Sequence, residues 1–158
     1  MNMRPGISAA AADGGEAQCQ FSALCYRIVE GVPQVLLITT RGSGRWILPK
    51  GWPMPGRTPA QTALREAWEE AGVIGTESDR CLGLFSYDKT IDGRSVPCVA
   101  QVFPVRVRGL ADTFPERGKR RRRWFLPADA ACRVAEPELA AILRDVGSTL
   151  PWLAAVAR

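Results

Sequence analysis

The 158-residue sequence contains no histidine. This absence excludes Ser-His-Asp triads, histidine general bases and most catalytic zinc sites, all of which need an imidazole group. The five cysteines are widely scattered and include no C-x-x-C pair, so neither a zinc site nor a disulfide framework is indicated. We expect reduced thiols and chemistry that depends on carboxylates, cations or a metal ion. The cysteines are Cys19, Cys25, Cys81, Cys98 and Cys132.

Long apolar runs are also absent. No stretch approaches the roughly 18 apolar residues of a membrane-spanning helix. Residues 1–16 are rich in alanine and glycine but lack the apolar core of a signal peptide. We therefore expect a disordered tail over residues 1–16, a single domain over residues 17–158, a cytoplasmic location and no membrane partner. The sequence leaves a monomer and a homodimer equally open.

Basic residues outnumber acidic ones, with 21 Lys and Arg against 16 Asp and Glu, and the net charge is +5. This balance predicts an anionic partner, and phosphates, nucleic acid and acidic membrane surfaces all satisfy it. Most of the basic residues are arginines. Because the planar guanidinium group binds phosphate in a bidentate manner, the composition favours a phosphate-bearing partner.

Apolar patterning predicts an α/β protein. Short apolar or alternating runs predict strands, and a turn at Asp92-Gly93 separates two of them. Pro127 opens a short helix, and residues 136–146 have the apolar spacing of an amphipathic helix. A hairpin turn is expected at Gly31-Val32-Pro33. The predicted strands are residues 20–29, 34–40, 46–48, 82–87, 96–107 and 120–126.

A further helix is predicted over residues 59–71. Thr58 is a suitable N-cap, with Pro59 at the first helical position and Gln61 at the capping-box position. Gly72 is a natural C-cap residue, because glycine adopts the left-handed conformation that ends a helix. Both ends of this helix are therefore marked in the sequence.

Three carboxylates lie on one face of that helix. At about 100° per residue, Glu66, Glu69 and Glu70 share an arc of about 100°, next to a stripe of alanines. Carboxylates at this spacing repel one another. Either a solvated face with basic neighbours or a bound hard cation would relieve the repulsion. Oxygen ligands suit Mg²⁺ or Mn²⁺ better than zinc or copper.

The segment around these glutamates decides between the two uses. Residues 51–73 read GWPMPGRTPAQTALREAWEEAGV. They resemble the signature of the Nudix hydrolases, G-x5-E-x7-R-E-U-x-E-E-x-G-U, where U is an aliphatic residue. One position departs, because Arg57 stands where the family has its first glutamate. The residues that match are Gly51, Arg65, Glu66, Glu69, Glu70, Gly72 and Val73, with Ala67 as a small aliphatic residue.

The resemblance implies a fold and a mechanism. The fold is an α/β/α sandwich with a mixed β-sheet, a catalytic loop-helix-loop and a C-terminal helix. Glu66, Glu69 and Glu70, with the Gly51 carbonyl, would hold one to three Mg²⁺ ions, or Mn²⁺, against a diphosphate, and a water would attack phosphorus. Arg65 lies one turn before Glu69 and would hold its carboxylate. The general base is a box glutamate or an acidic residue on a later loop, where Glu116 and Asp112 are candidates.

Flanking segments narrow the resemblance further. Residues 45–52, 23–27 and 123–125 are similar to the diphosphoinositol polyphosphate phosphohydrolase branch and its bacterial relatives. This similarity implies a polyphosphorylated small molecule as substrate, of the diadenosine polyphosphate or diphosphoinositol polyphosphate type. Gln18 and Gln20 stand where basic contacts to an inositol phosphate are expected, which argues against the second type. The candidate substrate contacts are Arg41, Arg45, Lys50, Arg57 and Arg122, and Arg57 could equally be solvated.

Two other functions stay open at this stage. A nucleoside triphosphate or RNA 5′-end pyrophosphohydrolase would use the same scaffold. A catalytically weak Nudix-like module that binds nucleotide or RNA would explain Arg57 and the basic run at residues 117–123. Such a run contacts RNA less often than it is solvated or binds phosphate. The intact glutamates argue against a binding module, because it has no need of mutually repulsive carboxylates.

Overall fold

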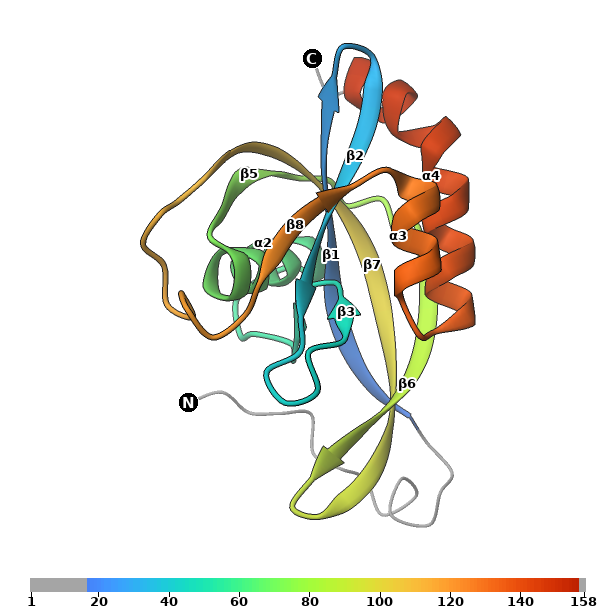
Figure 1. Cartoon of the computed structure of the whole chain (residues 1–158). Helices are drawn as coiled ribbons and strands as arrows, with labels where there is room; N and C mark the ends of the chain where they lie inside the picture. Colours follow the sequence, from blue (N-terminus) through green and yellow to red (C-terminus); the bar gives the residue numbers. More distant parts are fainter. Residues whose placement is uncertain (1–16, 157–158) are drawn as a thin grey trace.

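The computed structural model describes residues 17–156, and side chains as far as residue 150 (Figure 1). The tail expected at residues 1–16 lies outside the described residues. Within residues 17–156, eight strands form one mixed sheet with the path β3-β2-β1-β7-β5, and β4, β6 and β8 pair with β1, β7 and β2. The strands are β1 (Gln18–Val29), β2 (Val32–Thr39), β3 (Trp46–Ile47), β4 (Lys50–Gly51), β5 (Val73–Glu77), β6 (Gly83–Ile91), β7 (Arg94–Leu110) and β8 (Arg122–Phe125).

Helices cover both faces of the sheet, which confirms the predicted α/β/α sandwich (Figure 1). Helix α2 (Pro59–Ala71) packs on one face through the alanines of its inner stripe, which are fully or almost fully buried. Helices α3 (Pro127–Arg133) and α4 (Pro137–Val156) cover the other face, where Leu139, Leu143 and Val146 pack against strand residues such as Leu24. One hydrophobic core lies on one face of β1 and β2, and the other core lies on the opposite face of the same two strands.

Two tight turns connect neighbouring antiparallel strands. Asp92 and Gly93 both have positive φ, 50° and 76°, as the two-residue turn between β6 and β7 requires. The turn between β1 and β2 lies at Glu30-Gly31, with φ of 51° and 79°, and Val32 already belongs to β2. The turn predicted at residues 31–33 is therefore displaced by one residue.

The pairing of β1 places the glycine that begins the Nudix-like segment. β1 runs parallel to β7 and antiparallel to the two-residue strand β4, with Phe21 opposite Gly51 and Ser22 opposite Lys50. The Ala23 N–H and the Ser22 hydroxyl both donate to the Pro49 carbonyl, at 2.9 and 3.1 Å. These bonds fix residues 49–51 against the centre of the sheet, opposite the middle of α2.

The helix that carries the glutamates begins and ends as predicted. The Thr58 hydroxyl accepts from the Gln61 N–H, and the Gln61 side chain accepts from the Thr58 N–H, which completes the capping box. Gly72 adopts the left-handed conformation at the other end, with φ of 68°. β4 and β5 were not predicted, and α4 extends well beyond residue 146. No helix among the described residues is long and apolar enough to cross a membrane.

Candidate active site

Gly51 and Glu66 form the closest approach in the site. A Cβ added to Gly51 would overlap the carboxylate of Glu66 on α2. A larger residue at position 51 would therefore displace the Glu66 carboxylate, whereas glycine lets β4 lie against it. This contact explains the fixed spacing of 15 residues between Gly51 and Glu66 as a packing requirement.

Glu70 lies one turn further along α2 and is almost fully buried, with 8% of its surface exposed. Its Oε1 accepts from the Lys50 N–H at 3.3 Å, and its Oε2 lies 3.8 Å from the guanidinium of Arg120. Two segments distant in sequence thus hold this carboxylate, one before the helix and one after it. The site is assembled by the whole fold.

Both inner glutamates have unusual acidities. Burial, followed by the neighbouring Glu70 carboxylate, raises the pKa of Glu66 to about 9. Burial also raises the pKa of Glu70, although Arg120 and Lys50 act in the opposite direction. The cause is in each case the removal of a charged group from water, and in Glu66 a second like charge adds to it. A cation beside the pair would stabilise both ionised forms.

Lys50 supplies positive charge at the same place. Burial lowers the pKa of its ammonium group to about 8, and Glu70 partly offsets this shift. Its Nζ lies 4.8 Å from the centroid of the Tyr87 ring, within cation–π range. The charged form of such an ammonium group is stabilised when a phosphate takes the place of the water that it has lost.

These residues line one pocket of about 380 Å³. Its walls come from β1, β4 and the loop after it, α2, and β6. The pocket therefore combines two carboxylates with two ammonium groups, which is the arrangement expected of a site for a metal ion and a phosphate chain. The lining residues are Gln20, Lys50, Gly51, Trp52, Pro53, Met54, Glu66, Glu70 and Lys89.

Glu69 does not join this pair. Its Oε1 accepts from Arg65 Nε at 3.3 Å, an i,i+4 ion pair that holds the carboxylate outside the pocket. The helical arc was predicted correctly, but only two of the three carboxylates converge. In agreement, no group of three acidic or cysteine side chains within the described residues is arranged to hold a metal ion. Glu66, Glu70 and the Gly51 backbone nevertheless suit a hard cation, since they line one pocket and offer it oxygen ligands.

Arg120 connects the site to the loop before β8. Besides Glu70, its guanidinium contacts Glu116, with Nε donating to Oε1 at 3.1 Å, and donates to the Thr39 carbonyl at 3.1 Å. Arg41 approaches the same Glu116 oxygen at 4.0 Å. Glu116, the candidate general base, thus lies beside the site and paired with arginine, while its N–H donates to the Glu69 carbonyl. Asp112 is exposed.

Three candidate substrate contacts lie elsewhere. Arg122 donates to the carbonyls of Ala71 and Ala111, at 2.7 and 2.9 Å, so its charge is used at the C-terminal end of α2. Arg45 pairs with Glu136 at 3.1 Å. Arg57 is exposed and borders a groove on the outer side of α2, together with Arg65. Of the arginines and lysine predicted to contact substrate, Lys50 alone lines the pocket with the glutamates.

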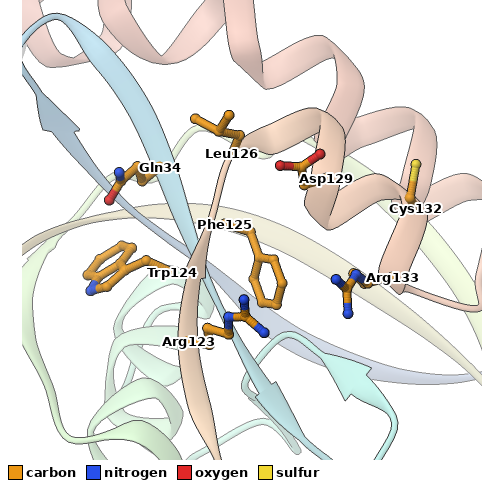
Figure 2. Close-up of a pocket in the computed structure, with 8 residues that line it drawn as sticks. All are labelled: Gln34, Arg123, Trp124, Phe125, Leu126, Asp129, Cys132 and Arg133. Carbon is orange, nitrogen blue, oxygen red and sulfur yellow. The ribbon is translucent and has the colours of Figure 1, made fainter.

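A second pocket, of about 320 Å³, lies between β8 and α3 (Figure 2). Arg123 and Arg133 each stack over the Phe125 ring there, at 5.2 and 5.6 Å from its centroid. No residue that matches the Nudix signature lines it. The chemistry that the glutamates can perform therefore belongs to the first pocket.

The sequence did not identify several residues of the site. Arg120 belongs to a run of basic residues, and nothing in the run distinguishes the member that turns inward. Lys89 and Tyr87 lie on a strand whose alternation does not distinguish them, and Gln20 carries no charge. Their roles depend on strand pairing, with Gln20 opposite Ala100 and Lys89 opposite Val96 on the two sides of β7.

Comparison with known proteins agrees with this geometry. The NUDIX domain profile matches residues 20–146, so this chain belongs to the Nudix family. The mouse protein diphosphoinositol polyphosphate phosphohydrolase 3-alpha is 33% identical over 109 residues, which cover 68% of this chain. The match spans 63% of the length of that relative.

Solved structures share the fold. A C. elegans Ap4A hydrolase in a binary complex superposes with a TM-score of 0.62 and 21% identity, over 84% of this chain and 96% of that one. A NUDIX hydrolase from Nitrosomonas europaea gives a TM-score of 0.62 and 18% identity, over 85% and 90% of the two chains. Nudix hydrolases use divalent metal ions, in keeping with the paired carboxylates of the pocket.

Proposed function

We propose that this chain hydrolyses a phosphoanhydride bond in an anionic, polyphosphorylated small molecule, with Mg²⁺ or Mn²⁺ as the metal ion. The observation that carries the proposal is that the half-buried Glu66 and the buried Glu70 lie in one pocket, which also contains Lys50 and Lys89. The family membership and the named activities of the relatives support it. A cytoplasmic location remains part of the proposal.

The residues in and around the pocket would divide the work of this reaction between them. Glu66, Glu70 and the Gly51 carbonyl would hold the ion. When bound, a divalent metal supplies charge neutralisation at phosphate oxygens and lowers the pKa of a coordinated water. Lys50 and Lys89 would bind the remaining phosphates, and burial strengthens these contacts because the local dielectric constant is low. Arg120 fixes Glu70, while Arg65 fixes Glu69.

We assign proton removal from the attacking water to a carboxylate beside the pocket, either Glu116 or Glu69. Glu116, which pairs with Arg120 and lies 4.0 Å from Arg41, is one candidate. Glu69, in its ion pair with Arg65, is the other candidate. Glu69 lies beside Glu66 and Glu70 on α2. Glu116 lies on the loop before β8, and its N–H donates to the Glu69 carbonyl.

The test is phosphate release from a substrate panel, measured with and without Mg²⁺. The panel contains diadenosine polyphosphates, diphosphoinositol polyphosphates, nucleoside triphosphates and RNA with a 5′ triphosphate. We expect metal-dependent turnover of a diadenosine or diphosphoinositol compound at the highest kcat/KM. Preference for triphosphates or RNA would move the chain to the alternative pyrophosphohydrolase function. Absence of turnover for every member would leave a binding module as the remaining function.

A further inference from the structure

A wide groove lies on the outer side of helix α2, between that helix, the loop before it and β5. This outer groove has a volume of about 660 Å³, and its lining residues include Arg57, Leu64, Arg65, Trp68 and Ile74. None of the described residues lines both this groove and the pocket of Glu66 and Glu70. Small-molecule sites typically have volumes of roughly 300–1,000 Å³. The outer groove is therefore large enough for a ligand of its own.

Two guanidinium groups, those of Arg57 and Arg65, line the outer groove. None of the described residues that line it is acidic. Arg57 is exposed, and its side chain forms no ion pair with any residue that the structure describes. Arg65 donates to Glu69 through Nε, at 3.3 Å, and its terminal amino groups have no hydrogen-bond partner within residues 17–150. Like charges in one groove repel each other, and a bound anion would relieve the repulsion.

The family signature shows where this excess of positive charge originates. The signature has a glutamate at the position of Arg57, so this chain has a cation where a carboxylate is expected in the segment. The exchange leaves Arg57 and Arg65 in one groove without a negative charge to separate them. A ligand that brings its own carboxylate would supply the missing charge. Guanidinium groups bind carboxylates through two parallel hydrogen bonds, which makes such a ligand a good geometric match.

Apolar side chains form another part of the outer groove. Leu64 and Trp68 lie one turn apart on α2 and are half-buried, and Ile74 on β5 is 50% exposed. Apolar side chains that are grouped at the surface and bordered by polar residues often mark ligand-binding grooves. The indole of Trp68 can also pack against a second ring. The groove therefore suits a molecule with an apolar ring and an acid group.

A protein chain fits the outer groove less well than a small molecule does. β5 is the last strand of the sheet path, so an extended peptide would have to pair with its outer edge. The register of β5 against β7 shifts between Ile74 and Gly75, and such irregularities disfavour the addition of a further strand. A second copy of this chain, related by a twofold axis at the groove, would bring its arginines against the same arginines.

We propose that the outer groove is a binding site for a small aromatic acid, separate from the pocket of Glu66 and Glu70. The carboxylate of the ligand binds Arg57 and Arg65, and its ring packs on the apolar side chains of α2 and β5. The inference goes beyond the proposed function and does not depend on it, because binding in the outer groove requires neither a metal ion nor turnover.

The test is calorimetric titration of the metal-free, full-length protein with 2-naphthoate and with the uncharged 2-naphthamide. We expect saturable binding of the acid and roughly fivefold or weaker binding of the amide, because the amide lacks the charge that the guanidinium groups bind. Arg57→Gln should weaken binding of the acid by a similar factor. Arg117→Gln is the matched control, since Arg117 is exposed and does not line the groove.

A second pair of variants tests the apolar part of the groove. Ile74→Thr keeps the branched shape of the side chain and should weaken binding of both compounds by about threefold. Val32→Thr, at a position that is 47% exposed and lies outside the groove, should leave binding unchanged.

Lys89→Gln distinguishes the outer groove from the pocket of Glu66 and Glu70, which Lys89 lines. Binding of 2-naphthoate should be unchanged in this variant. Weaker binding in Lys89→Gln together with unchanged binding in Arg57→Gln would place the acid in that pocket and overturn the inference. Equal affinities for acid and amide, or the absence of saturable binding of 2-naphthoate by the wild type, would also overturn it. The proposed function would stand in each of these cases, since its own test is metal-dependent turnover.

Discussion

Arg120 connects three parts of the site. It is 12% exposed at its side chain and contacts Glu70, Glu116 and the Thr39 carbonyl. Its charge lowers the pKa of Glu70 against the effect of burial. A guanidinium group suits this position because its planar fork can serve several acceptors at once.

Arg120→Ala should therefore weaken the metal site without removing a ligand. Loss of the guanidinium raises the pKa of Glu70 further, so that protons compete better with the metal at neutral pH. We expect a loss of about 10- to 100-fold in metal affinity, measured by calorimetric titration with Mn²⁺. Arg121→Ala is the matched control, because Arg121 is exposed and stacks on Trp46 instead. Equal affinities in the two variants would contradict this role.

The raised pKa of Glu66 makes the stability of the metal-free protein depend on pH. Its folded pKa of about 9 exceeds the ordinary value of 4.5, so the folded state binds the proton more tightly. The stabilisation is complete below about pH 4.5 and is lost as the pH rises towards 9. Denaturant unfolding of metal-free protein should show this decline. Glu66→Gln should flatten it, and an unchanged slope in that variant would refute the assignment.

Arg57 replaces the first glutamate of the family signature. It lies outside the pocket and borders the outer groove with Arg65, whose guanidinium holds Glu69. Arg57→Glu would draw Arg65 away and release Glu69 towards the metal. We expect kcat to increase several-fold at constant KM, in steady-state assays of both proteins. A fall in rate with a raised KM would instead identify Arg57 as a substrate contact.

At the scale of the element, the end of α2 depends on Arg122. The guanidinium satisfies the carbonyls of Ala71 and Ala111, and it covers the Phe114 ring at 4.9 Å. Gly72 must be glycine here, since its φ is 68° and a Cβ would lie 2.5 Å from Phe114. The helix terminus and the following strand are thus fixed to the loop before β8.

Arg122→Ala should destabilise the protein and leave substrate binding intact. Two carbonyls lose their charged partner, which costs about 1–3 kcal/mol in the free energy of unfolding. Denaturant unfolding measures this difference, and KM should stay within about twofold of the wild type. Arg123→Ala is the control at a neighbouring, exposed position. A raised KM without loss of stability would return Arg122 to the substrate contacts.

Local signals predicted some elements and not others. The helix over residues 59–71 was predicted correctly at both ends because capping residues and a C-terminal glycine act locally. β4 has two residues and no apolar period, and β5 follows the Gly72 cap without a break. Their pairing with β1 and β7 defines them, and pairing between distant segments leaves no local pattern.

At the scale of the whole molecule, the pocket is built from distant parts of the chain. β1 supplies Gln20, β4 supplies Lys50, β6 supplies Lys89, and α2 supplies the glutamates. The spacing of the Nudix-like segment predicts that Gly51, Glu66 and Glu70 lie together, and in the structure all three line the pocket. It could not identify the opposite wall, because strand order and the direction of each side chain decide which residues face the helix.

The side chain of Glu69 shows the same limit. Helical geometry predicted the face on which it lies, but its ion pair with Arg65 turns the carboxylate away from Glu66. Arg122 is a further example. It was predicted to contact substrate, but in the structure it donates to a carbonyl at the C-terminal end of α2. The sequence predicted where each of these residues lies on the backbone, but not which group its side chain contacts.

Metal-dependent turnover of a dinucleoside polyphosphate by wild type and Glu70→Gln tests the central claim most directly. The initial rate is measured over a titration of Mg²⁺, with Glu30→Gln, at an exposed turn, as the control. We expect Mg²⁺ to activate the wild type and the control to saturation. In Glu70→Gln the rate should fall at least about 100-fold, which is more than the loss of a residue that only supports a metal ligand would cause. Full activity in Glu70→Gln, or wild-type turnover that is indifferent to metal, would contradict the account.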